Sequence, residues 1–190
     1  MPRVSDSSSD DMQAARGASL SPGDDHGATT RTYVRLFAVV ALVAFVLDQV
    51  TKVVAVEKLQ GRESIEIIPG VLSLSFLRNP GAALSTGAGF TLVLSIIAIA
   101  VCVGVVRVAP RLRDRGWAVG LGLLLAGALG NLSDRIFREP SPLKGHVVDF
   151  IDYGVFVGNV ADIALTFAAI IIVWRAWRGV RIDGTREEKS

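Results

Sequence analysis

The sequence contains a single cysteine and only two histidines among its 190 residues. One thiol, Cys102, cannot form an internal disulfide, and no Cys-x-x-Cys metal site is present. His26 and His146 are too few for an HExxH motif or for a three-histidine zinc site. These absences exclude a disulfide framework and zinc sites built from Cys-x-x-Cys, HExxH or three histidines.

Motifs for phosphate binding and nucleophilic catalysis are also missing. There is no GxxxxGK[ST] loop and no GxGxxG following a strand, and Ser85, the serine that could pair with His146, lies outside a GxSxG sequence. Twenty basic residues oppose eighteen acidic ones, with no patch that mixes basic and aromatic side chains. This balance does not favour nucleic-acid binding.

Apolar residues are what the sequence does have. They make up 51% of the chain, and the mean hydropathy is +0.47, which is too apolar for an ordinary soluble domain. Four runs approach the roughly 20 apolar residues that a helix needs to cross a bilayer: 34–56, 90–108, 117–137 and 160–177. We therefore expect a mainly α integral membrane protein with four transmembrane helices in a domain over 31–180.

Both ends of the chain differ from this domain. Residues 1–30 are rich in Ser, Asp and Gly and poor in large apolar residues, which predicts a disordered cytoplasmic tail. The tail is too acidic and too long for a secretory signal peptide, so the first apolar run is interpreted as a retained helix. Residues 181–190 are interpreted as a cytoplasmic C-terminal tail.

Basic residues predict the orientation of the spans. Arginines precede the first run, recur over 107–115 between the second and third runs, and close the fourth run at Arg175, Arg178 and Arg181. Four crossings place these clusters on one side, which the positive-inside rule makes cytoplasmic. Both termini are then expected inside, with 57–89 and 138–159 outside.

Local patterns add detail to this topology. SIEIIPGVLSLSFLR alternates apolar and polar residues, which predicts short strands at the outer surface, and NPGAALSTGAG indicates turns before the second span. Gly122, Ala126 and Gly130 are spaced four apart in the third span. Small residues at this spacing predict close approach of a neighbouring helix.

Polar side chains are expected to meet near the outer face. With a rise of about 1.5 Å per residue, Asp48 and Asn131 each lie roughly 21 Å from the inner end of their span, and Asp134 lies slightly further out. The fourth span enters from outside and carries Asp162 in its first turn, just after Asn159. Ionisable residues inside a membrane are functional candidates by default.

Purely structural roles are also open for these groups. Asn159 fits a helix N-cap with Asp162 favoured by the helix dipole. Asp48 and Lys52, four residues apart, fit an ion pair on one helix face.

The remaining polar residues have structural interpretations as well. Asp134 next to Arg135 fits an interfacial anchor, Asp152 a solvated loop carboxylate, and Asn79-Pro80-Gly81 a simple turn.

Two carboxylates on different segments can hydrolyse a bond without metal. Two carboxyl groups held close together cannot both ionise and therefore share one proton. The ionised acid can then activate water while the protonated acid donates to a carbonyl. Asp149 and Asp162 fit this pattern. The acids could instead hold Mg²⁺ or Ca²⁺, although they lack a recognised loop spacing. A small proton-coupled transporter that uses the acids as a relay, or a non-catalytic membrane scaffold, would also fit these residues.

Five motifs occur in a fixed order: DQVTK at 48–52, NPGAALS at 79–85, GALGNLSDR at 127–135, VVDF at 147–150 and NVAD at 159–162. In these motifs, and in the spans between them, the chain resembles lipoprotein signal peptidase (signal peptidase II), an intramembrane aspartyl peptidase family, over about 33–178.

The resemblance implies a bacterial inner-membrane enzyme whose active site lies near the outer face. Such an enzyme removes signal peptides from prolipoproteins before a diacylglyceryl-modified cysteine, uses no cofactor or metal, contacts membrane lipids, and is inhibited by globomycin. It also implies that Asp149 and Asp162 form the catalytic dyad. The positions that would bind substrate or support the site are Asp48, Lys52, Asn79, Gly81, Asn131, Asp134, Arg135 and Asn159.

Two features depart from the family pattern. Gly158 stands where the family often has Phe, and the connection between Asp149 and Asp162 is shorter than in many relatives. Both concern how the chain closes over the site. Because the implied substrate carries acyl chains, we also expect a pocket that opens sideways to lipid.

Overall fold

Four long helices dominate the computed structural model, which describes residues 25–81, 88–140 and 142–186. They are α1 (Asp25–Leu59), α2 (Ala88–Val108), α3 (Arg115–Phe137) and α4 (Val160–Trp177), and the short 3-10 helix η2 (Ala109–Arg111) follows α2. Each long helix contains a stretch long and apolar enough to cross a membrane. The predicted mainly α fold with four spans is confirmed.

The ends of the domain differ from the prediction. Helix α1 begins at Asp25, so the last part of the predicted disordered tail, residues 25–30, is helical; residues 1–24 lie outside the described part. At the other end, part of the region interpreted as a C-terminal tail, residues 181–186, has a defined structure. They fold back in a turn closed by an isolated β-bridge between Val180 and Arg186.

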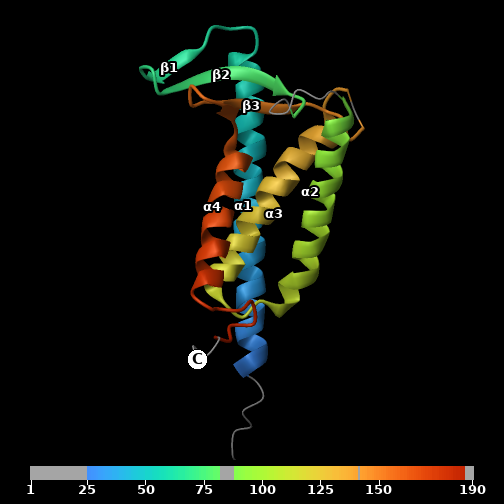
Figure 1. Cartoon of the computed structure of the whole chain (residues 1–190), viewed down its shortest axis with the longest axis vertical. Helices are drawn as coiled ribbons and strands as arrows, with labels where there is room; N and C mark the ends of the chain where they lie inside the picture. The colour runs from blue at the N-terminus through green and yellow to red at the C-terminus, as the bar shows by residue number, and fades with distance from the viewer. Residues whose placement is uncertain (1–24, 82–87, 141, 187–190) are drawn as a thin grey trace, which may run out of the picture.

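Helix α3 lies at the centre and contacts each of the other three long helices (Figure 1). Its small residues allow this close packing. A Cβ atom added at Gly122 would lie 2.9 Å from the Phe37 carbonyl oxygen of α1, and one added at Gly127 would lie 2.7 Å from the Ala161 carbonyl oxygen of α4. The predicted small-residue stripe therefore faces α1, and Gly127 serves a second contact with α4.

A four-stranded antiparallel sheet lies at one end of the helices, in the order β1–β2–β3–β4 (Figure 1). Its strands are β1 (Ile65–Ile68), β2 (Leu72–Asn79), β3 (Val147–Asp152) and β4 (Val157–Gly158). The first two strands confirm the alternation seen in the sequence. The second pair was not predicted, because VVDFID was interpreted as part of a loop.

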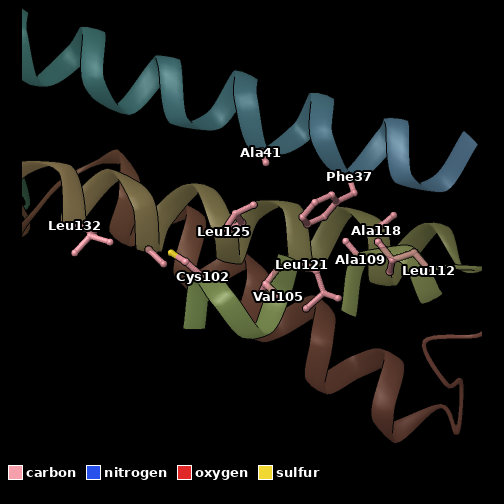
Figure 2. Close-up of a cluster of buried hydrophobic side chains, with 11 residues drawn as sticks. Phe37, Ala41, Cys102, Val105, Ala109, Leu112, Ala118, Leu121, Leu125 and Leu132 are labelled. Atoms are coloured by element: carbon pink, nitrogen blue, oxygen red, sulfur yellow. The ribbon is translucent and has the colours of Figure 1, made fainter. Parts of the chain in front are cut away.

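Two apolar clusters hold the helices and the sheet together. The larger lies away from the sheet and joins α1, α2 and α3 around Phe37, Val105 and Leu125 (Figure 2). The smaller joins the sheet end of α1 to β3 through Leu59, which packs with Val148. Between these clusters lies a layer of buried polar side chains, which contains the predicted site residues.

Candidate active site

Lys52 is the centre of the buried polar layer and is fully inaccessible to solvent. Its ammonium nitrogen lies 3.0 Å from Asp48 Oδ2, 3.0 Å from Asp134 Oδ2 and 3.1 Å from Asn131 Oδ1. An ammonium group has three donors, so all three are used. The predicted ion pair between Asp48 and Lys52 is confirmed, and it is part of a larger network.

Asp48 joins three helices. Its second oxygen, Oδ1, accepts a hydrogen bond of 2.8 Å from the backbone N–H of Ala161 in the first turn of α4. A Cβ atom at Gly130 of α3 would lie only 2.5 Å from Asp48 Oδ2. Gly130 therefore has to lack a side chain for the Asp48 carboxylate to fit, and Asp48 acts as a positioning residue for the start of α4.

Asp134 connects α3 to the sheet. Its Oδ2 accepts a hydrogen bond of 3.1 Å from the backbone N–H of Val148 in β3, and its Oδ1 accepts one from Arg138. The anchor pair suggested for Asp134 and Arg135 is not what forms, because the partners of Asp134 are Lys52 and Arg138. The sequence reasoning missed Arg138, although its spacing of four from Asp134 was a usable signal.

Asn159 connects the two candidate catalytic acids. Its Nδ2 donates to Asp149 Oδ1 at 2.6 Å, and its backbone N–H donates to Asp162 Oδ2 at 3.0 Å. Its Oδ1 in turn accepts a hydrogen bond from the backbone N–H of Asp162, which completes a capping box at the start of α4. Asn159 is thus both a helix cap and a member of the site.

Asn131 connects Lys52 to the same pair of acids. Its Oδ1 accepts from Lys52 and, at 3.2 Å, from Asn159 Nδ2, while its own Nδ2 donates to Asp162 Oδ1 at 3.0 Å. The buried ammonium group therefore fixes the orientation of the Asn131 amide, and the amide fixes Asp162. Both oxygens of Asp162 accept hydrogen bonds from donors that are themselves held in place.

The sheet brings Asn79 beside Asp149. Asp149 pairs with Leu77 of β2, so Asn79 lies two residues further along the same face. Asn79 Nδ2 donates to Asp149 Oδ2 at 2.7 Å, and Asn79 Oδ1 accepts from the Gly81 N–H at 2.8 Å. Gly81 has a φ of +99°, a conformation that favours glycine. The NPG segment is therefore a turn that also orients a site residue.

Asp149 is 2% exposed and lies in β3, outside the membrane-spanning helices. Burial raises the pKa of its carboxyl to about 6, and the negative charge of Asp162 acts in the same direction. Hydrogen bonds from Asn79 and Asn159 act in the opposite direction. A carboxyl with this pKa can carry a proton close to neutral pH, as a general acid must.

Arg135 is a charged neighbour of the acid pair, and one of its hydrogen-bond donors has no partner among the described residues. The carboxylates whose charge acts on it are those of Asp162, Asp149 and Asp134. Its Nε atom is buried, and no hydrogen-bond partner for it occurs in the described part of the chain. A buried donor without a partner is costly, so Arg135 Nε–H is available for a ligand.

The connection between the two acids is a hairpin. Tyr153 N–H donates to the Phe156 carbonyl at 3.0 Å, and the two rings stack with their centroids 4.8 Å apart. Asp152 is the half-buried last residue of strand β3 and accepts a hydrogen bond of 2.8 Å from Gly154 N–H, so it lies in a strand and not in a loop.

Gly158 lies buried in β4, next to both the hairpin and the site. A Cβ atom there would lie 3.1 Å from Asp162 Oδ2 and 3.3 Å from the Phe156 ring. The Phe156 ring therefore covers the space beside Gly158 in this chain.

A cavity of about 240 Å³ opens beside Asp162. Apart from that carboxylate and Thr166 it is lined by apolar or aromatic side chains, namely Tyr153, Phe156, Ile163 and Phe167. Phe156 of the hairpin and Phe167 of α4 are each more than half exposed. The cavity therefore joins one candidate catalytic carboxylate to an apolar surface.

The structure brings together all the predicted site residues: Asp48, Lys52, Asn79, Gly81, Asn131, Asp134, Arg135, Asp149, Asn159 and Asp162. Within the described residues, no group of three or more His, Cys, Asp or Glu side chains could hold a metal ion. Ser85 lies outside the described part. The arrangement offers an acid, a second carboxylate held by two hydrogen bonds, and an unused guanidinium donor.

Comparisons with known proteins, by sequence and by structure, give consistent matches. The model of the signal peptidase (SPase) II family, Peptidase_A8, matches residues 40–178. The lipoprotein signal peptidase of Rhodococcus jostii is 44% identical over 153 residues, which is 80% of this chain and 77% of the relative. That of Streptomyces coelicolor is 48% identical over 153 residues, or 79% and 74% of the two chains.

A solved structure shares the fold. It is a bacterial membrane enzyme determined by the in meso method at 1.9 Å resolution, with a TM-score of 0.65 and 33% identity, covering 74% of this chain and 91% of that one. Fold, buried site and sequence likeness point to the same conclusion: this chain belongs to the signal peptidase II family.

Proposed function

We propose that this chain is an intramembrane aspartyl endopeptidase that removes signal peptides from diacylglyceryl-modified prolipoproteins, cleaving before the lipidated cysteine. Family membership supports a peptidase that acts on prolipoproteins. The observation that carries the catalytic assignment is Asn159, whose side chain binds Asp149 and whose backbone binds Asp162. Two carboxylates from a strand and a helix are thereby held around one residue.

In the proposed reaction Asp162 is the base and Asp149 is the acid. Asp162 takes a proton from water, the water oxygen attacks the scissile carbonyl carbon, and Asp149 gives its proton to the carbonyl oxygen. The proton on Asp162 then passes to the leaving nitrogen as the C–N bond breaks. The proton of the original carbonyl oxygen returns to Asp149 as the carboxylic acid product forms. The raised pKa of Asp149 supports its role as the acid.

The surrounding residues have positioning roles in this proposal. Arg135 Nε–H is the unused donor and would bind a backbone carbonyl of the substrate. The cavity beside Asp162 would receive an apolar segment of the substrate and admit it from the lipid. A globomycin-type inhibitor would compete for the same space.

The distribution of charge supports the proposed orientation of the chain in the membrane. The sheet and the acid pair are at one end of the bundle, and the arginine-rich connection 107–115 is at the other (Figure 1). The positive-inside rule makes the arginine end cytoplasmic, so both ends of the domain would face the cytoplasm and the active site would lie near the outer face of the inner membrane.

The test is cleavage of a diacylglyceryl-modified precursor by the purified full chain. Asp149→Asn and Asp162→Asn should each lower kcat by about 10²- to 10⁴-fold or more. Asp152→Asn is the matched control, since Asp152 lies in the same stretch and bonds only to the hairpin and Ser75 among the described residues. Full cleavage by either dyad variant would overturn the assignment, and proton flux in liposomes without cleavage would favour a transporter.

A further inference from the structure

A second cavity, of about 480 Å³, is lined by residues between 108 and 117 and between 176 and 183. The elements that carry these residues meet at the end of the bundle opposite the sheet (Figure 1). The cavity is formed by the end of α2, the start of α3, the end of α4 and the turn that follows α4. Its charged and large apolar lining side chains are Val108, Arg111, Trp117, Arg181, Ile182 and Asp183. The proposed reaction uses none of them.

The turn that forms one wall is held firmly in place. Trp117 Nε1–H donates to the Val180 carbonyl at 2.8 Å, and Arg113 N–H donates to the Ile182 carbonyl at 2.9 Å. Val180 is 5% exposed. The N-cap of α3, Asp114, forms an ion pair with Arg175 of α4. These contacts fix the start of α3 against the end of α4 and the turn that follows it, so the cavity is a built feature of the fold.

The charges at the cavity favour an anion. Arg111 and Arg181 line it, and Arg111 forms no ion pair with any carboxylate of the described residues. One carboxylate, Asp183, also lines it and would oppose an anion. Hydrogen bonds from Thr185 and the charge of Arg181 hold the pKa of Asp183 below its ordinary value, so it is ionised. Two guanidinium groups therefore face one carboxylate.

The remaining walls are apolar, and α4, whose end lines the cavity, also carries an exposed tryptophan. Val108 and Ile182 line the cavity with the Trp117 ring, and Trp177 on the last turn of α4 is 79% exposed. Tryptophan is typical of the membrane interface, where one end of the ring is apolar and the other is wet. A small inorganic anion would leave these apolar walls unused.

We propose that this cavity binds the headgroup of an anionic phospholipid, with the phosphate on Arg111 and Arg181 and the glycerol and upper acyl carbons against the apolar walls. Guanidinium groups bind phosphate oxygens with charge-assisted hydrogen bonds. Basic pockets between transmembrane helices on the cytoplasmic side are suited to anionic headgroups. The lipid would brace the ends of α2, α3 and α4 against one another, far from the catalytic acids.

The experiment uses tryptophan quenching in bilayers. Trp174→Phe and Trp177→Phe leave Trp117 as the only indole, because the chain has three tryptophans. The full chain is placed in phosphatidylcholine bilayers that contain either brominated phosphatidylglycerol or brominated phosphatidylcholine. Brominated phosphatidylglycerol should quench Trp117 at a several-fold lower mole fraction.

Charge variants locate the site. Arg111→Gln and Arg181→Gln should each reduce the preference for phosphatidylglycerol about fivefold, which corresponds to ~1 kcal/mol per arginine. The double variant Arg111→Gln with Arg181→Gln has a matched control in Arg107→Gln with Arg178→Gln, which removes the same charge at the same end of the bundle from residues that do not line the cavity. This pair should keep most of the preference.

Three results would overturn the proposal. Equal quenching by the two lipids would show no preference for an anionic headgroup. An equal loss in the control pair would assign the effect to general surface charge. Displacement of phosphatidylglycerol by millimolar inorganic phosphate would identify a site for free phosphate. Arg111→Gln alone is the smaller change if the double variant is unstable, and precursor cleavage plays no part in the readout.

Discussion

Two asparagine side chains determine how Asp149 is presented, because each is oriented by a second hydrogen bond. The carbonyl oxygen of Asn79 accepts from Gly81 N–H, and that of Asn159 accepts from Asp162 N–H. Each amide nitrogen is thereby turned toward Asp149, and each oxygen of Asp149 has one donor. The position of the acid is thus set by backbone groups of a turn and of a helix start.

Gly81→Ala should therefore lower cleavage through Asn79. A side chain at a φ of +99° is strained, and relaxing the turn would remove the hydrogen bond that orients the amide. We expect a roughly ten- to hundredfold loss of kcat, as small misplacements near reacting groups cause. Gly70→Ala is the control, since Gly70 has a φ of +70° with no atom near its absent Cβ. Equal losses in both variants would contradict the role of Asn79.

The raised pKa of Asp149 also predicts a pH dependence of stability. The folded state holds the proton up to about pH 6, whereas the unfolded chain releases it near the ordinary value of 3.8. The contribution of Asp149 is thus fully present below pH 4 and is lost as the pH rises through 6. The free energy of unfolding of the native chain, relative to Asp149→Asn, should fall by roughly 3 kcal/mol over this range.

Thermal or denaturant unfolding of both proteins in the same detergent, at several values between pH 4 and pH 8, measures this difference. Asparagine does not titrate, so any change in stability that the substitution itself causes is the same at every pH. Such a change does not affect the difference between the slopes of unfolding free energy against pH. Parallel pH profiles for the two proteins would show that the Asp149 pKa is not raised.

At the scale of the elements, α3 is the helix that all the others depend on. Its glycines admit α1 and α4, its Asn131 and Asp134 supply partners for Lys52, and its Asp134 also binds the backbone of β3. The Lys52 ammonium group is therefore the point at which α1, α3 and, through the asparagines, α4 and the sheet are tied together.

Removing that charge should be costly. Lys52→Met would leave Asp48 and Asp134 without their shared partner, and an unpaired buried charge typically costs about 3–5 kcal/mol. Lys58→Met, at the exposed end of the same helix, should change stability by less than about 1 kcal/mol. Unfolding measurements on the two variants test this. Similar midpoints would mean that the buried network contributes little.

At the scale of the whole molecule, the sequence predicts some features better than others. Hydropathy locates the spans, and the helical rise brings Asp48, Asn131 and Asp162 to one layer, because both follow from local periodicity. Strand β3 could not be predicted in this way, since VVDFID becomes a strand by pairing with β2, about 70 residues away along the chain. The Arg138 partner of Asp134 was overlooked because Arg135 is the nearer neighbour in sequence.

The predicted orientation can be checked by labelling. In a Cys102→Ala background, Glu63→Cys lies beside the sheet and Thr185→Cys lies in the turn after α4, both at exposed positions. A membrane-impermeant maleimide should label the first in intact cells and the second only after lysis, and the background chain should stay unlabelled. The reverse pattern would place the catalytic acids near the cytoplasm.

The ion pairs of the polar layer have a consequence for biogenesis. Asp48 and Lys52 are four residues apart on α1, and Asp134 near the end of α3 lies four residues before the C-cap, Arg138. Each helix therefore carries its own counterion, and a neutral pair is far cheaper to place in lipid than a lone charge. We expect the first and third spans to enter the bilayer one after another during synthesis, and Lys52 to gain Asp134 as a second partner afterwards while both original pairs remain. The network that holds the folded protein together is assembled from pairs that the first and third spans bring with them.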